Sequence, residues 1–315
     1  MASGFRVETP QQHALRALME LDEDGPDHQL HGVTNLGGTC WMGAILGLLR
    51  AVPNHFRELL TRVEAGLVGQ RLGEALDGFD SGVVNPKKLL TAFRAGLDSS
   101  SALRDDKAQQ DAYEGLAALF ALCKVEAAKE TVFHPSGKIV EWVTCRNSTC
   151  LNPKCKRVVK NSPETTNILI LPLRDEEEAV ALHDLLSRTC DSRCIETFVC
   201  AEGDETNFCT CTEALAQRLI TVVPEIVFLV VARFRKDVRL TTKVTPSMEF
   251  RVKSKIYKLK SIVCHVGASP HMGHYVVYFL DGLRWYRQDD EKVAEIVPFD
   301  VSVVAESAYL FAYAS

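Results

Sequence analysis

The sequence predicts an α+β fold, in which a mainly helical part precedes a part rich in strands. Apolar residues recur at helical spacing from Cys40 to about residue 127. After Thr131 the chain changes to β-branched and aromatic runs bounded by Gly, Pro, Asn and Asp. The 315 residues are 46% hydrophobic, which suffices for a substantial core and is unlike the composition of a disordered chain. This length allows two ordinary domains or one large domain with subdomains.

Three helices are predicted in the first part, after a leader. Residues 1–30 are mixed and contain the acidic stretch LDEDGPDHQ, so we expect them to form a short leader. A helix begins near Cys40, and the apolar residues that follow share one helical face: Trp41, Ile45, Leu48 and Leu49. A second helix is expected in PKKLLTAFRAGL (86–97), which starts with a proline that the first turn tolerates. AYEGLAALFALCKVEAAKE (112–130) has the pattern of a third helix.

Five runs in the second part are predicted to be strands of a mostly antiparallel arrangement. They are KIVEWVTC (138–145), NILILPL (167–173), EIVFLVVARF (225–234), YKLKSIVCHV (257–266) and HYVVYFLDGLRWYR (274–287).

Charge and hydropathy exclude several classes of protein. The net charge of -5 argues against a general nucleic-acid binder. The sequence has no run of 18 apolar residues, so no membrane span is predicted. The opening MASGFRVETPQQH lacks the layout of a secretory signal, so we expect an intracellular protein, cytoplasmic or nuclear or both. In a reducing compartment, eleven cysteines indicate metal binding or catalysis rather than disulfides.

Cys40 follows a Gly-Gly-Thr turn and opens the first predicted helix. The N–H groups at a helix start lower the pKa of a thiol, and glycines before it allow close approach of a substrate. The side-chain amide of Asn35 is a further candidate donor to an oxyanion. An isolated cysteine at a tight turn is more often a buried structural thiol, so this stretch alone leaves both interpretations open.

A nucleophilic cysteine needs a base and a group that orients the base. His274 lies at the start of a predicted strand, and Asp289 follows fifteen residues later, after a turn and a second strand. Paired strands of a hairpin would bring the two side chains together. His265 and His271 are rival candidates for the base.

Four motifs, in this order, resemble those of the ubiquitin-specific proteases, the papain-like deubiquitinases. GVTNLGGTCWMGAILGLL (32–49) resembles their cysteine box, and HVGASPHMGHYVVYFLDGLRWYRQDDEKV (265–293) resembles their histidine box. Between them, QQDAYEGL (109–116) and VVPEIVFLVVARF (222–234) resemble two further family motifs. The resemblance runs from about residue 30 to the C-terminal residue.

The resemblance implies a papain-like fold with a helical thumb, β fingers and a β-rich palm. We expect the thumb at about 31–127, the fingers at about 128–220 and the palm at about 221–315. The active site then lies in the cleft between thumb and palm.

By motif position, the resemblance also assigns the catalytic roles. Cys40 is the expected nucleophile, His274 the general base and acid, and Asp289 the orienting carboxylate. Asn35 is the expected side chain of the oxyanion hole. Asp290 is expected to assist in place of Asp289 or beside it, and the alternative is a solvated turn residue.

The sequence departs from the family pattern near the nucleophile. Trp41 replaces the usual Tyr or Phe, and Gly115 takes the place of the Phe in QQDAYEGL. Gly38, Gly43 and Gly47 stand where Asn, Asn and Gln are common. The two glycines within the helix should weaken it by about 1 kcal/mol each relative to Ala.

Eight of the eleven cysteines fall between Cys145 and Cys211. Family members often carry a zinc ribbon made of two cysteine pairs, and four thiolates around Zn²⁺ form a closed structural site. The positions that the family would use are Cys150, Cys155, Cys209 and Cys211. The alternative ligands are Cys145, Cys190, Cys194 and Cys200. The spacing is irregular, so incidental reduced thiols are the competing interpretation, and no cofactor is expected for catalysis.

The leading hypothesis is a cysteine protease that hydrolyses the (iso)peptide bond after the C-terminal Gly-Gly of ubiquitin through a thioester. Its partners would then be ubiquitin or ubiquitinated proteins, and neither nucleic acid nor membrane. Three alternatives are a protease for another ubiquitin-like modifier, a catalytically weak ubiquitin-binding scaffold and a zinc-dependent interaction module.

Overall fold

The computed structural model describes residues 30–315 with internal gaps. The gaps are residues 107, 124–141, 153–154, 156–157, 161, 163, 176, 192, 196–208, 210, 236–237 and 270–271. The predicted leader, 1–30, therefore lies outside the described residues apart from Leu30. Residues His31–Ser315 form one compact unit.

Helices dominate the first part of this unit, as predicted. They are α2 (Cys40–Arg50), α3 (Asn54–Thr61), α4 (Gly66–Gly78), α5 (Lys87–Gly96) and α6 (Ala112–Leu122), with single 3₁₀ turns at Val63–Ala65 and Ala102–Arg104. The helix predicted in 86–97 is confirmed as α5, with Pro86 at its N-cap. The helix predicted in 112–130 is α6, and the end of that prediction, 124–130, lies outside the described residues.

The larger sheet has eight strands in the order β16-β15-β14-β13-β17-β8-β4, with β12 paired to β13. These strands are β4 (Ile168–Pro172), β8 (Ile226–Ala232), β12 (Glu249–Val252), β13 (Lys255–Ser269), β14 (Met272–Asp281), β15 (Arg284–Asp289), β16 (Lys292–Ile296) and β17 (Ala308–Ala314). The β4–β8 pair is parallel and the other pairs of this sheet are antiparallel.

A second sheet of five strands contains most of the remaining β structure. Its strands are β1 (Trp142–Cys150), β2 (Val158–Lys160), β3 (Glu164–Thr166), β6 (Arg193–Ile195) and β7 (Ala214–Val222), all antiparallel. Two small pairs complete the list: β9 (Phe234–Arg235) with β10 (Val238–Arg239), and β5 (Ala179–Ala181) with β11 (Lys243–Thr245). The range 128–220 contains parts of both sheets, because β4 pairs with β8.

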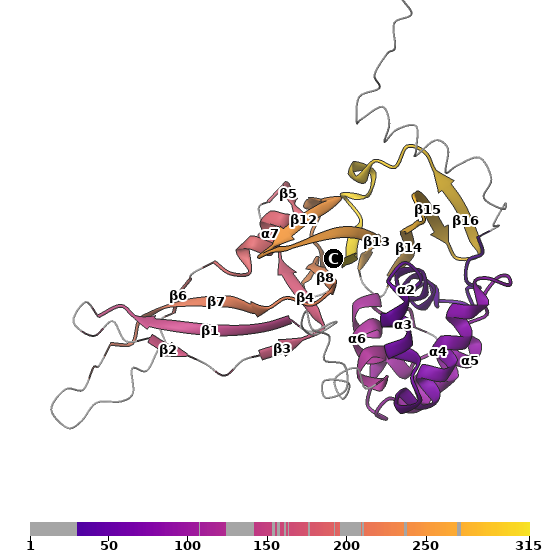
Figure 1. The fold of residues 1–315 in the computed structure, drawn as a ribbon, viewed down its shortest axis with the longest axis horizontal. Coiled ribbons are helices and arrows are strands. Elements are labelled where there is room, and N and C mark those ends of the chain that lie inside the picture. The colour runs from indigo at the N-terminus through magenta and orange to yellow at the C-terminus, as the bar shows by residue number, and fades with distance from the viewer. Residues whose placement is uncertain are drawn as a thin grey trace, which may run out of the picture. The chain divides into compact units, whose positions relative to one another are not determined.

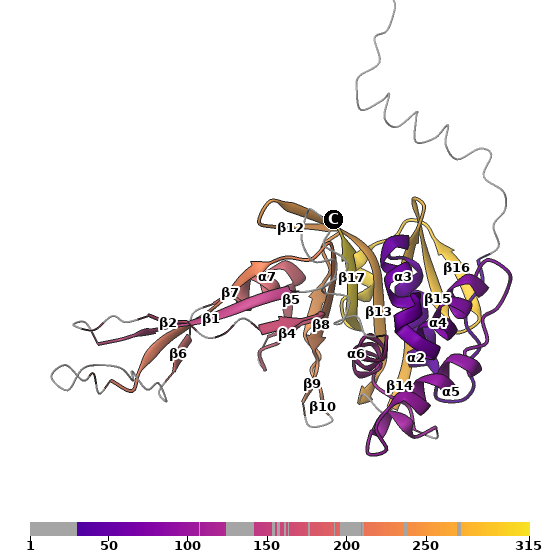
Figure 2. The ribbon, with the colours of Figure 1, turned by 60° about the horizontal axis from the view of Figure 1, so that its bottom comes forward.

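Successive residues of the larger sheet pack on opposite faces. Val263, Tyr275 and Val277 face the helices and join the cluster that contains α2. Cys264 and Val276 face the other way and pack with α7 (Leu182–Arg188). Figures 1 and 2 both show α2 lying beside β13 and β14, with the other helices of the first part around it. Among the helices described, none has the length and hydropathy needed to cross a membrane.

Helix α2 is buried along its whole length except at its last residue, Arg50. Its apolar face is confirmed, because Trp41, Ile45, Leu48 and Leu49 are all fully buried. Arg50 is half-buried, and its guanidinium lies 4.1 Å from the centre of the Phe79 ring and 4.5 Å from that of Phe279.

Two departures from the family pattern compensate for each other. A Cβ atom at Gly115 would lie 2.6 Å from the Trp41 ring, so the indole occupies the space in which a side chain at 115 would begin. The larger ring at 41 and the missing side chain at 115 therefore belong together. Trp41 also contacts Phe93, with ring centroids 5.8 Å apart.

We expect Gly115→Ala to lower the free energy of unfolding by about 1–3 kcal/mol, because the new methyl overlaps the indole. In a Trp41→Phe background the same change should cost less, since the smaller ring leaves room. Thermal or denaturant unfolding of the two single variants and the double variant measures this coupling. Strictly additive losses would show that the two positions do not compensate.

Candidate active site

Cys40 is the first residue of α2, and its side chain is 4% exposed. Its sulfur accepts hydrogen bonds from the backbone N–H groups of Tyr275 and Trp41, and the N–H of Cys40 itself also favours the thiolate. The Tyr275 contact places the sulfur beside the strand that carries His274, because the two residues are consecutive on β14.

The thiol of Cys40 has a raised pKa, so the prediction of a lowered pKa from the helix start alone is wrong. Burial is the largest cause, because the thiolate loses hydration, and the negative charge of Asp290 adds to it. The backbone N–H donors lower the pKa but do not outweigh these effects. The free thiol is therefore protonated at neutral pH and needs a base.

His274 and Asp289 are brought together by the β14–β15 hairpin, as their spacing predicted. His274 Nε2 lies 2.7 Å from Asp289 Oδ1, so the ring is oriented with its Nε2–H donating to the carboxylate. Arg287 Nη2 donates to the other oxygen, Oδ2, at 2.7 Å. Partial burial disfavours the charge on Asp289, but the hydrogen bonds from His274 and Arg287 outweigh it and the pKa of Asp289 is lowered.

Asp290 lies between His274 and Asn35. Its Oδ2 accepts a hydrogen bond of 3.0 Å from Asn35 Nδ2 and lies 4.0 Å from His274 Nε2. Asn35 Oδ1 accepts from the backbone N–H groups of Gly37 and Thr39 at 3.1 and 3.2 Å. Asn35 thus holds the turn before Cys40 with its carbonyl and faces Asp290 with its amide.

The motif at 109–116 connects α6 to the strands behind the site. Asp111 caps α6, and its carboxylate accepts from the backbone N–H groups of Tyr113 and Glu114. The Tyr309 hydroxyl donates to the same buried carboxylate at 2.8 Å. The Ala112 N–H donates to the hydroxyl of Tyr275 at 3.4 Å. Tyr275 is also the residue whose backbone N–H contacts the Cys40 sulfur.

Gln288 connects β15 to α2, a contact that the sequence did not predict. Its Nε2 donates to the carbonyl oxygen of Gly43 on α2 at 3.1 Å, so the residue before Asp289 is bound to the helix of the nucleophile. A Cβ atom at Gly47 would lie 2.4 Å from Val277 Cγ1 and 3.1 Å from Gln288 Oε1. Val277 and Gln288 thus fill the space where the family usually has a glutamine side chain on the helix.

Gly38 has a backbone φ of +65°, in the left-handed region. Glycine adopts this region freely, and asparagine is the residue that tolerates it next best. This explains why the family's Asn and the Gly of this chain are both compatible with the turn.

Of the two rival histidines, only His265 is described, and its ring is fully buried. Burial lowers its pKa to about 4, with smaller contributions from the charges of Arg239 and His274. A Cβ atom at Gly273 would lie 2.7 Å from His265 Nε2, so the backbone of Gly273 covers the ring. The structure pairs the carboxylate of Asp289 with His274 and not with His265. His271 lies outside the described residues.

The four cysteines at the family's zinc positions meet at the end of the five-stranded sheet. Sulfur atoms of Cys150, Cys155 and Cys209 lie within 4.8 Å of one another, and Cys150 also interacts with the Cys211 thiol. Cys150 Sγ and Cys209 Sγ are 3.8 Å apart.

None of the alternative cysteines that the structure describes joins this cluster. Cys190 follows α7, and Cys194 lies on β6. Cys200 and the side chain of Cys145 lie outside the described part of the chain.

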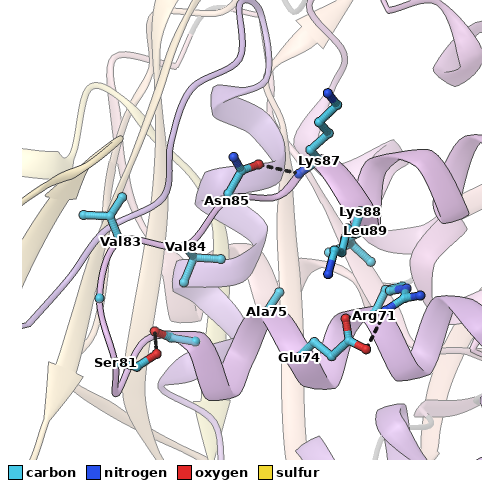
Figure 3. Close-up of a pocket in the computed structure, with 12 residues that line it drawn as sticks. Arg71, Glu74, Ala75, Ser81, Val83, Val84, Asn85, Lys87, Lys88 and Leu89 are labelled. Atoms are coloured by element: carbon cyan, nitrogen blue, oxygen red, sulfur yellow. Dashed lines mark hydrogen bonds and ion pairs between the residues drawn. The ribbon is translucent and has the colours of Figure 1, made fainter.

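A cavity of about 490 Å³ lies elsewhere, between the end of α4 and the start of α5 (Figure 3). Its wall includes Arg71, Val84 and Lys88, and none of the five candidate catalytic residues lines it. The catalytic arrangement described above is separate from this cavity.

Comparison with known proteins identifies the family. Residues 31–313 match the family model described as ubiquitin carboxyl-terminal hydrolase, so the chain belongs to this family. The resemblance stated from the four motifs is thereby confirmed.

The chain is 24% identical over 308 residues to a probable ubiquitin carboxyl-terminal hydrolase 8 of Schizosaccharomyces pombe, which covers 90% of this chain and 64% of the relative. It is 26% identical over 311 residues to ubiquitin carboxyl-terminal hydrolase 26 of Arabidopsis thaliana, with 88% and 27% covered. For ubiquitin carboxyl-terminal hydrolase 12 of Salmo salar the identity is 23% over 335 residues, with 90% and 89% covered. The chain thus spans less than two thirds of the first two relatives.

A solved structure of similar fold is the SAGA DUB module with Ubp8, Sgf11, Sus1 and Sgf73, bound to monoubiquitin. The TM-score is 0.71 at 19% sequence identity, and the match covers 96% of this chain and 74% of that chain. The mixed helix-and-sheet fold predicted from the sequence is confirmed as the fold of this family.

We expect alkylation of Cys40 by iodoacetamide to be slow at pH 7 and to keep rising above pH 9, because its pKa is raised above the ordinary thiol value of 9.0. Only the thiolate reacts, so the rate follows the thiolate fraction. Asp290→Asn removes a negative charge that opposes the thiolate, and the midpoint should move to lower pH. Mass spectrometry of the Cys40 peptide across pH measures both profiles. A wild-type midpoint near pH 6 would contradict the assignment.

Proposed function

We propose that this chain is a thiol-dependent deubiquitinase, which hydrolyses the (iso)peptide bond after the C-terminal Gly-Gly of ubiquitin. The observation that carries the proposal is that His274 lies 2.7 Å from Asp289 on the neighbouring strand, while Tyr275, the residue after His274, donates its N–H to the Cys40 sulfur. Membership of the ubiquitin carboxyl-terminal hydrolase family and the ubiquitin bound in the similar Ubp8 module support ubiquitin as the substrate.

In this mechanism His274 takes the thiol proton of Cys40. Its Nε2 is committed to Asp289, so Nδ1 is the nitrogen that accepts the proton. The sulfur then attacks the carbonyl carbon of the last glycine, and the C–N bond breaks as His274 returns the proton to the departing amine. Water activated by His274 hydrolyses the resulting thioester, which releases ubiquitin and restores the Cys40 thiol.

The negative oxygen that forms during both steps needs fixed donors. The backbone N–H of Cys40 is one candidate, and the Asn35 side-chain amide is the other. One hydrogen of that amide is bound by Asp290, which holds the group in place and leaves the second hydrogen for the substrate oxygen. Asp290 therefore supports Asn35 beside the His274–Asp289 pair, rather than replacing Asp289.

We further propose that Cys150, Cys155, Cys209 and Cys211 bind a structural Zn²⁺. Four sulfurs around zinc at about 2.3 Å lie about 3.8 Å from one another, which is the separation of the Cys150 and Cys209 sulfurs. A hydrogen bond from the Cys211 backbone N–H lowers the pKa of Cys209, which favours the thiolate that zinc needs, whereas burial raises the pKa of the neighbouring Cys150. The zinc would join β1 to the segment before β7 and takes no part in the reaction.

The proposed chemistry requires reduced thiols, both at Cys40 and in the cysteine cluster. All nine cysteines whose side chains the structure describes are free thiols. An intracellular location, cytoplasmic or nuclear, fits this requirement.

Cys40→Ala should abolish cleavage of ubiquitin that carries a fluorogenic amide on its C-terminal glycine, since no other group attacks the carbonyl. Asp289→Asn should lower kcat by roughly 10²–10⁴-fold, because the His274 ring loses its fixed orientation. Cys190→Ala is the matched control and should cleave at the wild-type rate. Cleavage by Cys40→Ala would refute the nucleophile. If the wild-type protein binds ubiquitin without cleaving it, the result would favour a ubiquitin-binding scaffold. If it cleaves only another ubiquitin-like modifier, that modifier and not ubiquitin would be the substrate.

Purified chain should contain one zinc ion, and Cys209→Ser should lose it because three thiolates hold zinc more weakly than four. Metal analysis by mass spectrometry after gel filtration measures the stoichiometry, and the melting temperature should fall on treatment with a chelator. Cys194→Ser is the control and should keep the metal. Wild-type protein free of zinc after expression in zinc-containing medium would refute the site.

A further inference from the structure

The segment His31–Asn35, here called the linking segment, runs between the helical part and the turn that follows β15. On the helical side, its Gly32 carbonyl accepts from the Val84 N–H at 2.9 Å, and its Thr34 N–H donates to the Val84 carbonyl at 2.8 Å. On the other side, the Val33 N–H donates to the carbonyl of Asp290 at 2.8 Å. The backbone of this segment therefore holds both sides at once.

Gly32 allows an unusually close approach of the linking segment to that turn. A Cβ atom at position 32 would lie 2.1 Å from the carbonyl oxygen of Asp290. It would also lie 2.7 Å and 2.8 Å from the carbonyl carbon and Cα of Glu291. All three are backbone atoms, so no side-chain rotation relieves the overlap, and only glycine fits while the turn stays where it is.

The turn itself holds Asp290 in the left-handed region of backbone conformation. Asp290 and Glu291 are the two loop residues between β15 and β16, because Asp289 pairs with Lys292. Asp290 has a φ of +52°, a conformation that glycine, asparagine and aspartate adopt most readily in tight turns. Its carboxylate is thereby directed toward Asn35 and His274.

We propose that Gly32 is a positioning residue, which fixes the Asp290 carboxylate between Asn35 and His274 by letting the linking segment lie against the turn. The inference rests on the proposed function, in which Asn35 and His274 act on the substrate. In this proposal Gly32 acts through Asp290, whose backbone is among the atoms nearest to its missing side chain. Because the same segment is hydrogen-bonded to Val84, it also fixes the position of the acidic turn relative to the helical part.

A double-mutant cycle tests this route of action. Gly32→Ala should lower kcat for the fluorogenic ubiquitin amide on the order of 10²-fold, with KM nearly unchanged, because the reacting groups are misplaced and the substrate surface is not. Asp290→Gly removes the carboxylate while keeping a residue that suits the positive φ. In this background Gly32→Ala should change kcat by less than about threefold, since there is no carboxylate left to misplace. Gly78→Ala is the matched control, because its Cβ meets Val84 at 3.4 Å and leaves the turn untouched.

A second readout is independent of any ubiquitin activity. The charge of Asp290 raises the pKa of Cys40, against the Tyr275, Trp41 and Cys40 N–H donors. Gly32→Ala pushes the turn away, so the midpoint of Cys40 alkylation should move to lower pH, as in Asp290→Gly. The double variant should match Asp290→Gly. This profile reports on Gly32 even where the wild type fails to cleave ubiquitin, so the two proposals fail separately.

Additive losses in kcat together with additive shifts of the alkylation midpoint would overturn the proposal, because Gly32 would then act without Asp290. Melting curves check that each variant is folded. If Gly32→Ala does not fold, Thr34→Pro replaces it in the cycle. It removes the N–H bound to Val84 together with the threonine side chain, and the extended Val33 before it already suits a proline. The same loss of effect in the Asp290→Gly background is expected, and an undiminished effect there refutes the route.

Discussion

The close approach of α2 to β14 and β15 is the constraint on which the rest of the structure depends. At Gly47 the helix lies so near the sheet that a Cβ atom would overlap Val277. The same proximity lets Gln288 reach the Gly43 carbonyl and lets Ser261 donate to the Leu48 carbonyl at 3.1 Å. The helix that carries Cys40 is thus bound to the strands that carry His274 and Asp289, through glycines that sacrifice intrinsic helix stability for contact.

This burial sets the chemistry of Cys40. A thiol enclosed by a helix and a sheet loses the hydration that stabilises a thiolate, and the nearby carboxylate of Asp290 adds to the effect. The backbone N–H groups at the start of the helix lower the pKa of Cys40, but burial outweighs them. In the mechanism proposed above, the thiolate forms as the proton moves to His274, which Asp289 holds in one orientation. In this arrangement the Asp290 carboxylate of the acidic turn disfavours the resting thiolate and accepts the hydrogen bond from the Asn35 amide.

Much of the fold was predictable because its helices and strands follow from local sequence patterns. Buried elements are indicated by the apolar spacing after Cys40 and by the strand runs at 257–266 and 274–287. The Asp281-Gly282 turn predicts a hairpin, and the hairpin in turn predicts the contact of His274 with Asp289. The pKa of Cys40 was not predictable, because burial by β14 is a tertiary effect. Gln288 and Tyr309 were missed for the same reason, since no local pattern links them to Gly43 or Asp111.

The departures from the family pattern are explained by partners that lie far away in the chain. Gly115 is understood only beside Trp41, and Gly47 only beside Val277 and Gln288. At Gly47 and Gly115 the missing side chain therefore reflects a close approach by another segment, and the position of that segment decides what the glycine does. At Gly38 the requirement is a positive φ, and at Gly47 it is helix–sheet contact. At Gly32 the atoms approached belong to the turn that carries Asp290, so there the missing side chain bears directly on the geometry of the catalytic groups.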